Sequence, residues 1–331
     1  MRIAALVLVV LLAFVPSSFV ALSGTPVHAQ EQRAGKVSRI GFLRAGQPPK
    51  EWVEAFQQGL LERGYVDGKN VVIDFRFTEG SVDQLPQRAD ELVRSKVDVI
   101  LASAGPAAVA AKNATTSIPI VFVSVIDPVG LRLVSSLARP DGNITGLAIS
   151  SADLAGKRLE LLRELVPKLR RVAVLWNPPN PTNLLQLKEA EAAAHKLGLE
   201  VSPIQAQSPQ DLDAAFRNAR RADGLLQLDS PFFTTHRARI VGLTAETRLP
   251  AIYGYREMVE AGGLMSYGAH LADLHRRAAT YVDKILKGAK AADLPVEQPT
   301  KFELLINSRT AKTLGVTIPQ SLLLRADQIV E

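Results

Sequence analysis

No cysteine occurs among the 331 residues of the chain. This absence excludes a disulfide framework, a thiol nucleophile and any thiolate metal site. It also excludes a lipidated N-terminal cysteine as a tether to the membrane. The fold must therefore be stabilised by its hydrophobic core alone.

Recognisable catalytic and cofactor-binding motifs are also absent. The sequence contains no G-x-S-x-G elbow, no G-x-x-x-x-G-K-[ST] loop, no H-E-x-x-H and no G-x-G-x-x-G after a strand. The five histidines are scattered, and the spacing of His270 and His275 does not stack two metal ligands on one helical face. We expect no enzymatic activity, no metal and no cofactor.

Basic runs and aromatic residues are both sparse. The formal net charge of +6 is spread along the chain, and Phe, Trp and Tyr make up 5% of the residues. Nucleic acid is therefore not an expected partner. The composition, 47% hydrophobic and 22% charged, is that of an ordinary globular protein. The length suffices for two lobes of about 120–150 residues each.

A long apolar run lies at the N-terminus. Arg2 precedes an uninterrupted apolar segment, 3–15, which Pro16 ends. Val27, His28 and Ala29 then fit a small-residue cleavage site. A retained membrane anchor, the alternative, would need about 20 apolar residues. We therefore predict that residues 1–29 are a signal peptide removed on export, which leaves a soluble mature protein.

Beyond residue 36, apolar segments of strand length alternate with amphipathic segments of helix length. The expected strands are 37–44, 71–77, 97–102, 118–123 and 143–149, and the expected helices are 51–63, 82–96, 106–114 and, near the C-terminus, 274–287. Such alternation with short loops predicts an α/β fold with a parallel sheet wrapped by helices.

The same order of segments then recurs. "RRVAVLWNPPNP" echoes "VSRIGFLRAGQPP", "ADGLLQLDSP" echoes "VDVILASAGP", and "RLPAIYGYRE" echoes "SIPIVFVSVI". Five strand-like segments repeat at an offset of roughly 115–135 residues, far beyond the period of solenoid repeats. The sequence therefore predicts two similar α/β lobes.

Several long segments resemble one family. They include "AFQQGLLERGYVDGKNVVIDFRFTEGSVDQLPQRADELV", "IPIVFVSVIDPVGLRLVSSLARPDGNITGL", "KRLELLRELVPKLRRVAVLWNPPNP" and "KFELLINSRTAKTLGVTIPQSLLLRADQIVE". Together they resemble the ABC-transporter substrate-binding proteins whose better-known members handle tryptophan and other aromatic amino acids. The resemblance implies a type I periplasmic-binding-protein fold, in which two doubly wound lobes with parallel sheets close on a small-molecule ligand. It further implies an ABC permease in the inner membrane as partner. With the predicted export we expect a periplasmic location, and we expect a monomer.

In such folds the chain crosses between the lobes three times. We place the crossings near Ser150, near Ala269 and at 298–302. The first lobe would then comprise 30–149 plus 270–297, and the second 150–269 plus 298–331.

The candidate ligand-binding residues follow the predicted strands. Carboxyl ends of parallel strands lie at one edge of a sheet, where α/β proteins bind ligands. In the first lobe these residues are Arg44, Ser103, Ala104, Gly105, Ser124 and Asp127; in the second they are Asn177, Asn180, Asp229, Ser230, Tyr253 and Tyr267.

Their chemistry suits an amino acid or a similar carboxylate. Backbone N–H groups at 103–105, with hydroxyl donors from Ser103 and Ser124, favour a carboxylate at the start of the next helix. Asp229 and Asp127 could pair with an ammonium group. A flat ligand could stack on aromatic side chains, for which the candidates are Tyr253, Tyr267 and Trp176.

Each of these residues also has a purely structural interpretation. Ser and Asp after a strand often cap a helix or shape a turn, and helix capping is a direct alternative for Asp127, which precedes Pro128. Trp176 could be core, and Arg44 could be a surface charge or the partner of a carboxylate. Two other functions stay open: a ligand sensor for a signalling partner, and an exported two-domain enzyme using Asp127 and Asp229.

Overall fold

The computed structural model describes residues 37–149, 154–299 and 301–331. The predicted signal peptide and the crossing near Ser150 lie outside these residues, as does Thr300 within the third crossing. No helix among the described residues combines the length and the hydrophobicity needed to cross a bilayer.

The first sheet has five parallel strands in the order β2-β1-β3-β4-β5. Their bounds are β1 Ser38–Arg44, β2 Val71–Phe77, β3 Val99–Ser103, β4 Ile120–Ile126 and β5 Ile144–Ile149. Strands covered on both faces read as continuous apolar runs. In β4 every residue is buried and Ser124 is the one polar member, which makes it unusual.

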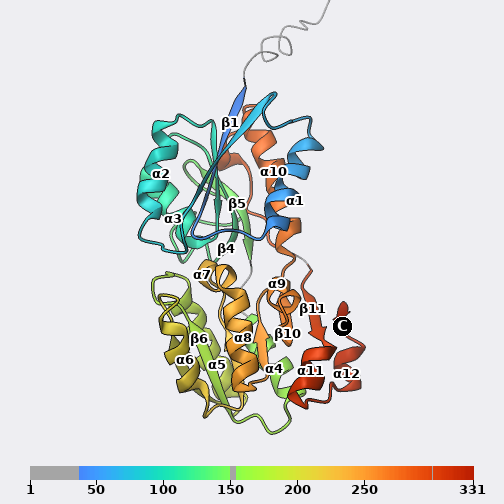
Figure 1. Cartoon of the computed structure of the whole chain (residues 1–331). Helices are drawn as coiled ribbons and strands as arrows, with labels where there is room; N and C mark the ends of the chain where they lie inside the picture. The colour runs from blue at the N-terminus through green and yellow to red at the C-terminus, as the bar shows by residue number, and fades with distance from the viewer. Residues whose placement is uncertain (1–36, 150–153, 300) are drawn as a thin grey trace, which may run out of the picture. The chain divides into compact units, whose positions relative to one another are not determined.

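Helices cover both faces of this sheet, and sheet and helices together are called the first lobe (Figure 1). The helices are α1 Lys50–Leu61 and α10 Leu271–Leu286 on one face, and α2 Leu85–Arg94 and α3 Gly105–Ala114 on the other. Trp52, Phe56 and Leu60 form the buried stripe of α1 at helical spacing. A Cβ at Gly59 would lie 2.3 Å from the Arg276 carbonyl oxygen, so this glycine lets α1 and α10 pack closely.

The second sheet has seven strands in the order β12-β11-β10-β9-β8-β6-β7. Their bounds are β6 Arg171–Trp176, β7 Glu200–Gln205, β8 Gly224–Gln227, β9 Ala251–Tyr253, β10 Met265–Gly268, β11 Glu303–Asn307 and β12 Gln328–Val330. The order β7-β6-β8-β9-β10 repeats that of the first sheet, which confirms the predicted repeat. One pair departs from the predicted parallel arrangement, since β11 runs antiparallel to β10.

The second sheet with its helices is called the second lobe. Its helices are α4 Leu154–Leu165, α5 Asn183–Lys196, α11 Ser308–Leu314 and α12 Gln320–Leu323 in one hydrophobic cluster, and α6 Asp211–Ala219 and α8 Arg237–Thr247 in another. Two short helices, α7 Pro231–Thr235 and α9 Arg256–Glu260, follow β8 and β9. A 3₁₀ turn, Ala291–Asp293, follows α10.

Candidate functional site

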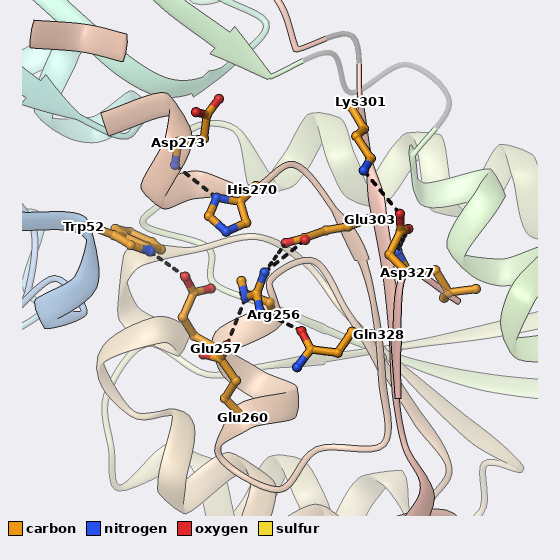
Figure 2. Close-up of polar contacts among 11 residues, drawn as sticks. Trp52, Arg256, Glu257, Glu260, His270, Asp273, Lys301, Glu303, Asp327 and Gln328 are labelled. Atoms are coloured by element: carbon orange, nitrogen blue, oxygen red, sulfur yellow. Dashed lines mark hydrogen bonds and ion pairs between the residues drawn. The ribbon is translucent and has the colours of Figure 1, made fainter. Parts of the chain in front are cut away.

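The carboxyl edges of the two sheets come together. Trp52, on the helix after β1, donates from Nε1 to Oε1 of Glu257, on the helix after β9, at 2.5 Å (Figure 2). The rings of Trp52 and Tyr255 meet edge to face with centroids 6.1 Å apart. A Cβ at Gly105 would lie 3.0 Å from Cγ2 of Thr182. The polar residues at these strand ends therefore occupy one region of the molecule.

Ser124 has the most unusual backbone in the first sheet. The register between β4 and β5 shifts between Val123 and Val125, which leaves Ser124 as the extra residue of a β-bulge with φ of 60°. A bulge re-aims a side chain, and such a positive φ costs roughly 1–3 kcal/mol in a non-glycine residue. The Ser124 hydroxyl is buried without a hydrogen-bond partner among the described residues. It is therefore free to donate to a ligand.

Ala104 is strained in the neighbouring turn. It caps α3 with φ of 74° and ψ of 162°, a region that glycine occupies almost exclusively. Its N–H donates to the Val123 carbonyl at 2.9 Å, and its carbonyl accepts from Ala108 at 3.1 Å. The first N–H groups of α3, beginning at Gly105, have no acceptor within the helix and suit an anion.

Ser103 does not have a free hydroxyl proton. His275, fully buried, has Nδ1 2.8 Å from the Leu271 carbonyl oxygen and Nε2 3.2 Å from Ser103 Oγ. A carbonyl only accepts, so Nδ1 carries the proton, and Nε2 then accepts from the Ser103 hydroxyl. Burial lowers the pKa of His275 to about 4, which keeps the ring neutral above that pH. The donor role predicted for Ser103 therefore fits Ser124 better.

The Asp127 side chain stabilises the turn that follows β4. The residue has φ of 47°, and its Oδ1 accepts from the Gly130 N–H at 2.8 Å. For the Asp127 carboxylate, the structure therefore supports the turn-shaping interpretation over pairing with an ammonium group.

Arg44 is a buried cation. Its Nη1 donates to the carbonyl oxygens of Ala45 at 3.0 Å and Gly46 at 3.1 Å, and Cζ lies 5.2 Å from the ring centroid of Trp52. Burial lowers the pKa of Arg44 to about 10, which leaves it protonated at neutral pH. The surface-charge alternative is wrong. Nε has no partner among the described residues, so one N–H of a buried cation is free.

Asp229 pairs with a residue that was not among the candidates. Nη1 and Nη2 of Arg158 each donate to Oδ2 of Asp229 at 3.1 Å, with both side chains 3% exposed. Burial raises the pKa of Asp229, and the charge of Arg158 opposes that shift. Oδ1 of Asp229 has no partner among the described residues. The pair thus leaves one buried acceptor oxygen unused.

Amide side chains hold the backbone of Asp229 in place. Gln186 Oε1 accepts from the Asp229 N–H at 2.9 Å. Three amide groups donate to the Asp229 carbonyl: Asn180 Nδ2 at 3.1 Å, Asn183 Nδ2 at 2.8 Å and Gln186 Nε2 at 3.3 Å. Asn180 is therefore a support for Asp229.

Asn177 and Ser230 belong to the same supporting network. The Ser230 hydroxyl donates to Asn177 Oδ1 at 3.2 Å and accepts from the N–H of Phe232, which makes Ser230 the cap of α7. Asn177 Nδ2 donates to the Ala206 carbonyl at 2.8 Å. Structural bonds therefore occupy the polar atoms of both side chains.

The aromatic candidates lie in different environments. Tyr253 is fully buried in the cluster beneath α8, and its hydroxyl donates to Thr244 Oγ1 at 3.1 Å. This position does not fit stacking on a ligand. Tyr267 is partly buried and its ring lies 6.0 Å from that of Phe302. Trp176 is partly buried and packs against a hydrophobic cluster of the second lobe.

Like Tyr267 on β10, Tyr255, two residues beyond β9, packs across onto the first lobe. Its backbone belongs to the second lobe, but its ring packs into the hydrophobic cluster of the first. Burial raises the pKa of its hydroxyl well above the usual value, and the charge of Asp229 adds to this shift. Tyr255 lies in the same strand-end segment, 253–256, as Tyr253, but only Tyr253 was singled out there as a ligand-binding residue.

No group of three or more His, Cys, Asp or Glu side chains within the described ranges is arranged to hold a metal ion.

Comparison with known proteins gives matches to a protein family and to a relative. Residues 46–330 match the family model described as ABC transporter substrate binding protein. The tyrosine-binding protein of Clostridioides difficile (strain R20291) is 30% identical over 265 residues, covering 80% of this chain and 76% of the relative.

Two solved structures are similar over nearly the whole chain. An ABC domain from Streptococcus pneumoniae in complex with L-Trp has a TM-score of 0.82 at 29% identity, covering 88% of this chain and 99% of that chain. The ligand-free, open structure of a substrate-binding protein with adhesive properties from Clostridium difficile has a TM-score of 0.63 at 26% identity, covering 89% and 99%. The similarity extends over both sheets.

Proposed function

Because this chain belongs to the ABC transporter substrate-binding protein family and has the type I periplasmic-binding-protein fold, we propose that it captures an aromatic amino acid for import. Proteins of this family bind a substrate and do not convert it. The captured molecule would be delivered to an ABC permease in the inner membrane.

The main observation behind the proposal is that Oδ1 of Asp229 is buried without a hydrogen-bond partner among the described residues. A buried ammonium group needs an anionic partner, because leaving it unpaired costs several kcal/mol. Arg158 engages only Oδ2, so Oδ1 is available to an ammonium. On the facing edge, the Ser124 hydroxyl, Arg44 Nε and the first N–H groups of α3 offer donors to a carboxylate. Both ends of an α-amino acid thus find complementary groups.

An aromatic side chain is favoured by Tyr255 and by the relatives. Tyr255 presents a ring between the two edges, where a flat ligand could pack against it. One relative is a tyrosine-binding protein and another was solved with L-Trp. Both observations support a ligand with an aromatic ring.

Capture would occur by closure of two hinged lobes, 30–149 plus 270–297 and 150–269 plus 298–331. Closure buries a small ligand between the lobes, so the ligand favours the closed population. The greater similarity to the L-Trp complex than to the open, ligand-free relative supports this proposal. Small-angle scattering should show a smaller radius of gyration at saturating ligand, and an unchanged radius would contradict hinge closure.

Export to the periplasm and a monomeric state complete the proposal. The apolar segment 3–15 and the cleavage pattern ending at Ala29 support cleavage before Gln30. N-terminal sequencing of exported protein tests this, since material that still begins at Met1 would exclude cleavage. Sedimentation equilibrium tests the monomer.

A thermal-shift screen of the purified protein tests the ligand class. The compounds are the aromatic amino acids, other amino acids, aromatic acids without an amino group, and sugars. We expect the aromatic amino acids to raise the melting temperature most, because only they satisfy Asp229, the donor edge and Tyr255 together. Stabilisation by sugars or polyols alone would exclude the proposed class.

A further inference from the structure

Trp52 joins the two lobes through a bond outside the ligand-binding groups described above. The indole is held from several sides: the His275 ring stacks on it at 5.0 Å, the Arg44 guanidinium lies 5.2 Å from its centroid, and Tyr255 meets its edge. This packing fixes the ring, and Nε1 points at Oε1 of Glu257 (Figure 2). Glu257 lies 205 positions away in sequence.

The short helix that carries Glu257 is anchored from the other side. Figure 2 shows Arg256 at the centre of a network in which Nε donates to Glu260 Oε1 at 2.9 Å and Nη2 to Gln328 Oε1 at 2.9 Å. Arg256 Nη1 also lies 3.0 Å from Glu303 Oε2. Glu303 and Gln328 belong to β11 and β12, the two strands outside the repeat. The C-terminal strands therefore hold α9, and with it Glu257, at the edge facing Trp52.

Glu257 is buried, yet only one of its oxygens has a partner. Oε1 accepts from Trp52, and Oε2 has no partner among the described residues. A charged oxygen buried without a partner is far costlier than a neutral hydroxyl. Burial raises the pKa of Glu257 from 4.5 to about 7, although the Trp52 hydrogen bond opposes the shift. In an open molecule the same side chain would meet water.

The other groups around Glu257 do not cancel this effect. Glu260 on the same helix raises the pKa of Glu257 further, and Arg256 lowers it. Arg44, at the end of β1, also interacts with Glu257, and Tyr255 beside it is uncharged because its pKa is raised. His275, behind Trp52, is neutral above a pKa of about 4.

We propose that Glu257 is a positioning residue that latches the lobes in the closed state through Trp52, and that closing the latch takes up one proton from solvent. The proton binds Oε2, while Oε1 continues to accept from Trp52 Nε1. The inference deepens the proposed function, because ligand capture by closure then becomes coupled to protonation. No other bond forms or breaks.

The coupling predicts a direction for affinity. The closed state binds the proton more tightly than the open one, so affinity falls as pH rises from about 4.5 towards 7 and is constant above. Between pH 5.5 and pH 8.5 the dissociation constant for L-Trp or L-Tyr should rise about 30-fold, from the shift of 4.5 to about 7. Isothermal titration calorimetry in two buffers of different ionisation enthalpy should show proton uptake on binding near pH 6.

Two variants separate the latch from general structural effects. Glu257→Gln keeps an acceptor for Trp52 but cannot titrate, so its affinity should be nearly independent of pH over this range. Glu54→Gln, on the helix that carries Trp52 and well exposed, is the matched control and should keep the 30-fold change. A pH-independent affinity in the unmodified protein, or an unchanged pH profile in Glu257→Gln, would overturn the proposal.

A second experiment, a fluorescence titration with pH, needs no ligand. The chain has two tryptophans, so Trp176→Phe leaves Trp52 as the one indole fluorophore. Its emission should change with a midpoint between pH 4.5 and about 7, the values for the open and closed states, and adding Glu257→Gln should remove that transition. If this transition occurs while no aromatic amino acid binds, the proposed ligand is wrong and the latch stands. If ligands bind but neither transition nor proton uptake is seen, the latch is wrong and the proposed function stands.

Discussion

Gly254 lies directly against the carboxylate of Asp229. A Cβ at Gly254 would come within 1.7 Å of Asp229 Oδ1 and 2.7 Å of Arg158 Nη2. Only a residue without a side chain leaves room for the ion pair in its present place. The free oxygen of Asp229 therefore depends on a glycine as well as on Arg158.

Gly254→Ala should displace the Asp229 carboxylate, lowering the free energy of unfolding by about 1–3 kcal/mol, the usual cost of overpacking. It should also weaken binding of L-Trp and L-Tyr. The matched control is Gly242→Ala in α8, where a Cβ would meet no atom within 4 Å. That change should stabilise the protein by about 0.5–1 kcal/mol. Chemical denaturation measures both, and equal effects at the two sites would contradict the close contact.

Asp229→Ala should weaken binding of L-Trp by about 2–5 kcal/mol, the range for truncating one partner of a buried charge pair. It should also lower the free energy of unfolding by about 3–5 kcal/mol, because Arg158 is left buried and unpaired. Asp229→Asn keeps an acceptor for Arg158 and isolates the effect on the ligand.

Calorimetric titration with L-Trp and with indole-3-propionic acid, which lacks the amino group, distinguishes the two effects. Asp229→Asn should weaken L-Trp more than the amine-free acid. Equal losses for both compounds would mean that Asp229 does not contact the ammonium.

Ala104→Gly should raise the free energy of unfolding by about 1 kcal/mol. The gain from relieving a backbone in the glycine-only region, about 1–3 kcal/mol, exceeds the entropy that glycine adds to the unfolded chain. Ala110→Gly within α3 is the control and should cost about 1 kcal/mol. Denaturant midpoints measure the stability of both variants. Destabilisation at both positions would show that the Ala104 backbone is not strained.

His275 should make stability fall in mild acid. Its folded pKa of about 4 lies below the usual value of 6.5, so the unfolded chain takes up a proton first as pH falls. The contribution is fully present above pH 6.5 and is lost by pH 4, a change of about 3 kcal/mol. His275→Phe keeps a ring beside Trp52 and should show a correspondingly smaller loss between pH 7 and 4. Parallel pH profiles for the two proteins would refute this role.

The repeat in the sequence predicts the arrangement of ten strands but not that of the two strands at the C-terminus. Continuous apolar runs such as that of β4 identify buried parallel strands, and their recurrence identifies two similar lobes. The antiparallel pairing of β11 with β10 has no counterpart in the repeat, so its direction depends on contacts between distant segments that sequence spacing does not encode.

The sequence predicts where the candidate site lies but not which hydrogen bonds its residues form. Strand ends locate the polar residues at one edge, but hydrogen-bond partners depend on tertiary packing. Arg158 carried a usable signal, since it lies on the buried stripe of α4, four residues from both Leu154 and Leu162. A charge on an apolar stripe needs a buried partner, and Asp229 is that partner.

Glu257 had no comparable signal, and Tyr255 had only its place in the strand-end segment 253–256. They lie in and just before α9, a helix of five residues that is too short to show a periodicity. Their positions depend on the anchoring of α9 by Arg256 to the C-terminal strands.

A crystal structure of the protein with the most stabilising aromatic amino acid tests the central claim most directly. We predict ligand density between the carboxyl edges of the two sheets, with the ammonium within hydrogen-bond distance of Asp229 Oδ1 and the carboxylate near Ser124 and the start of α3. Density located elsewhere, for example in the groove lined by Leu61, Tyr65 and Ile73 beside α1, would contradict it.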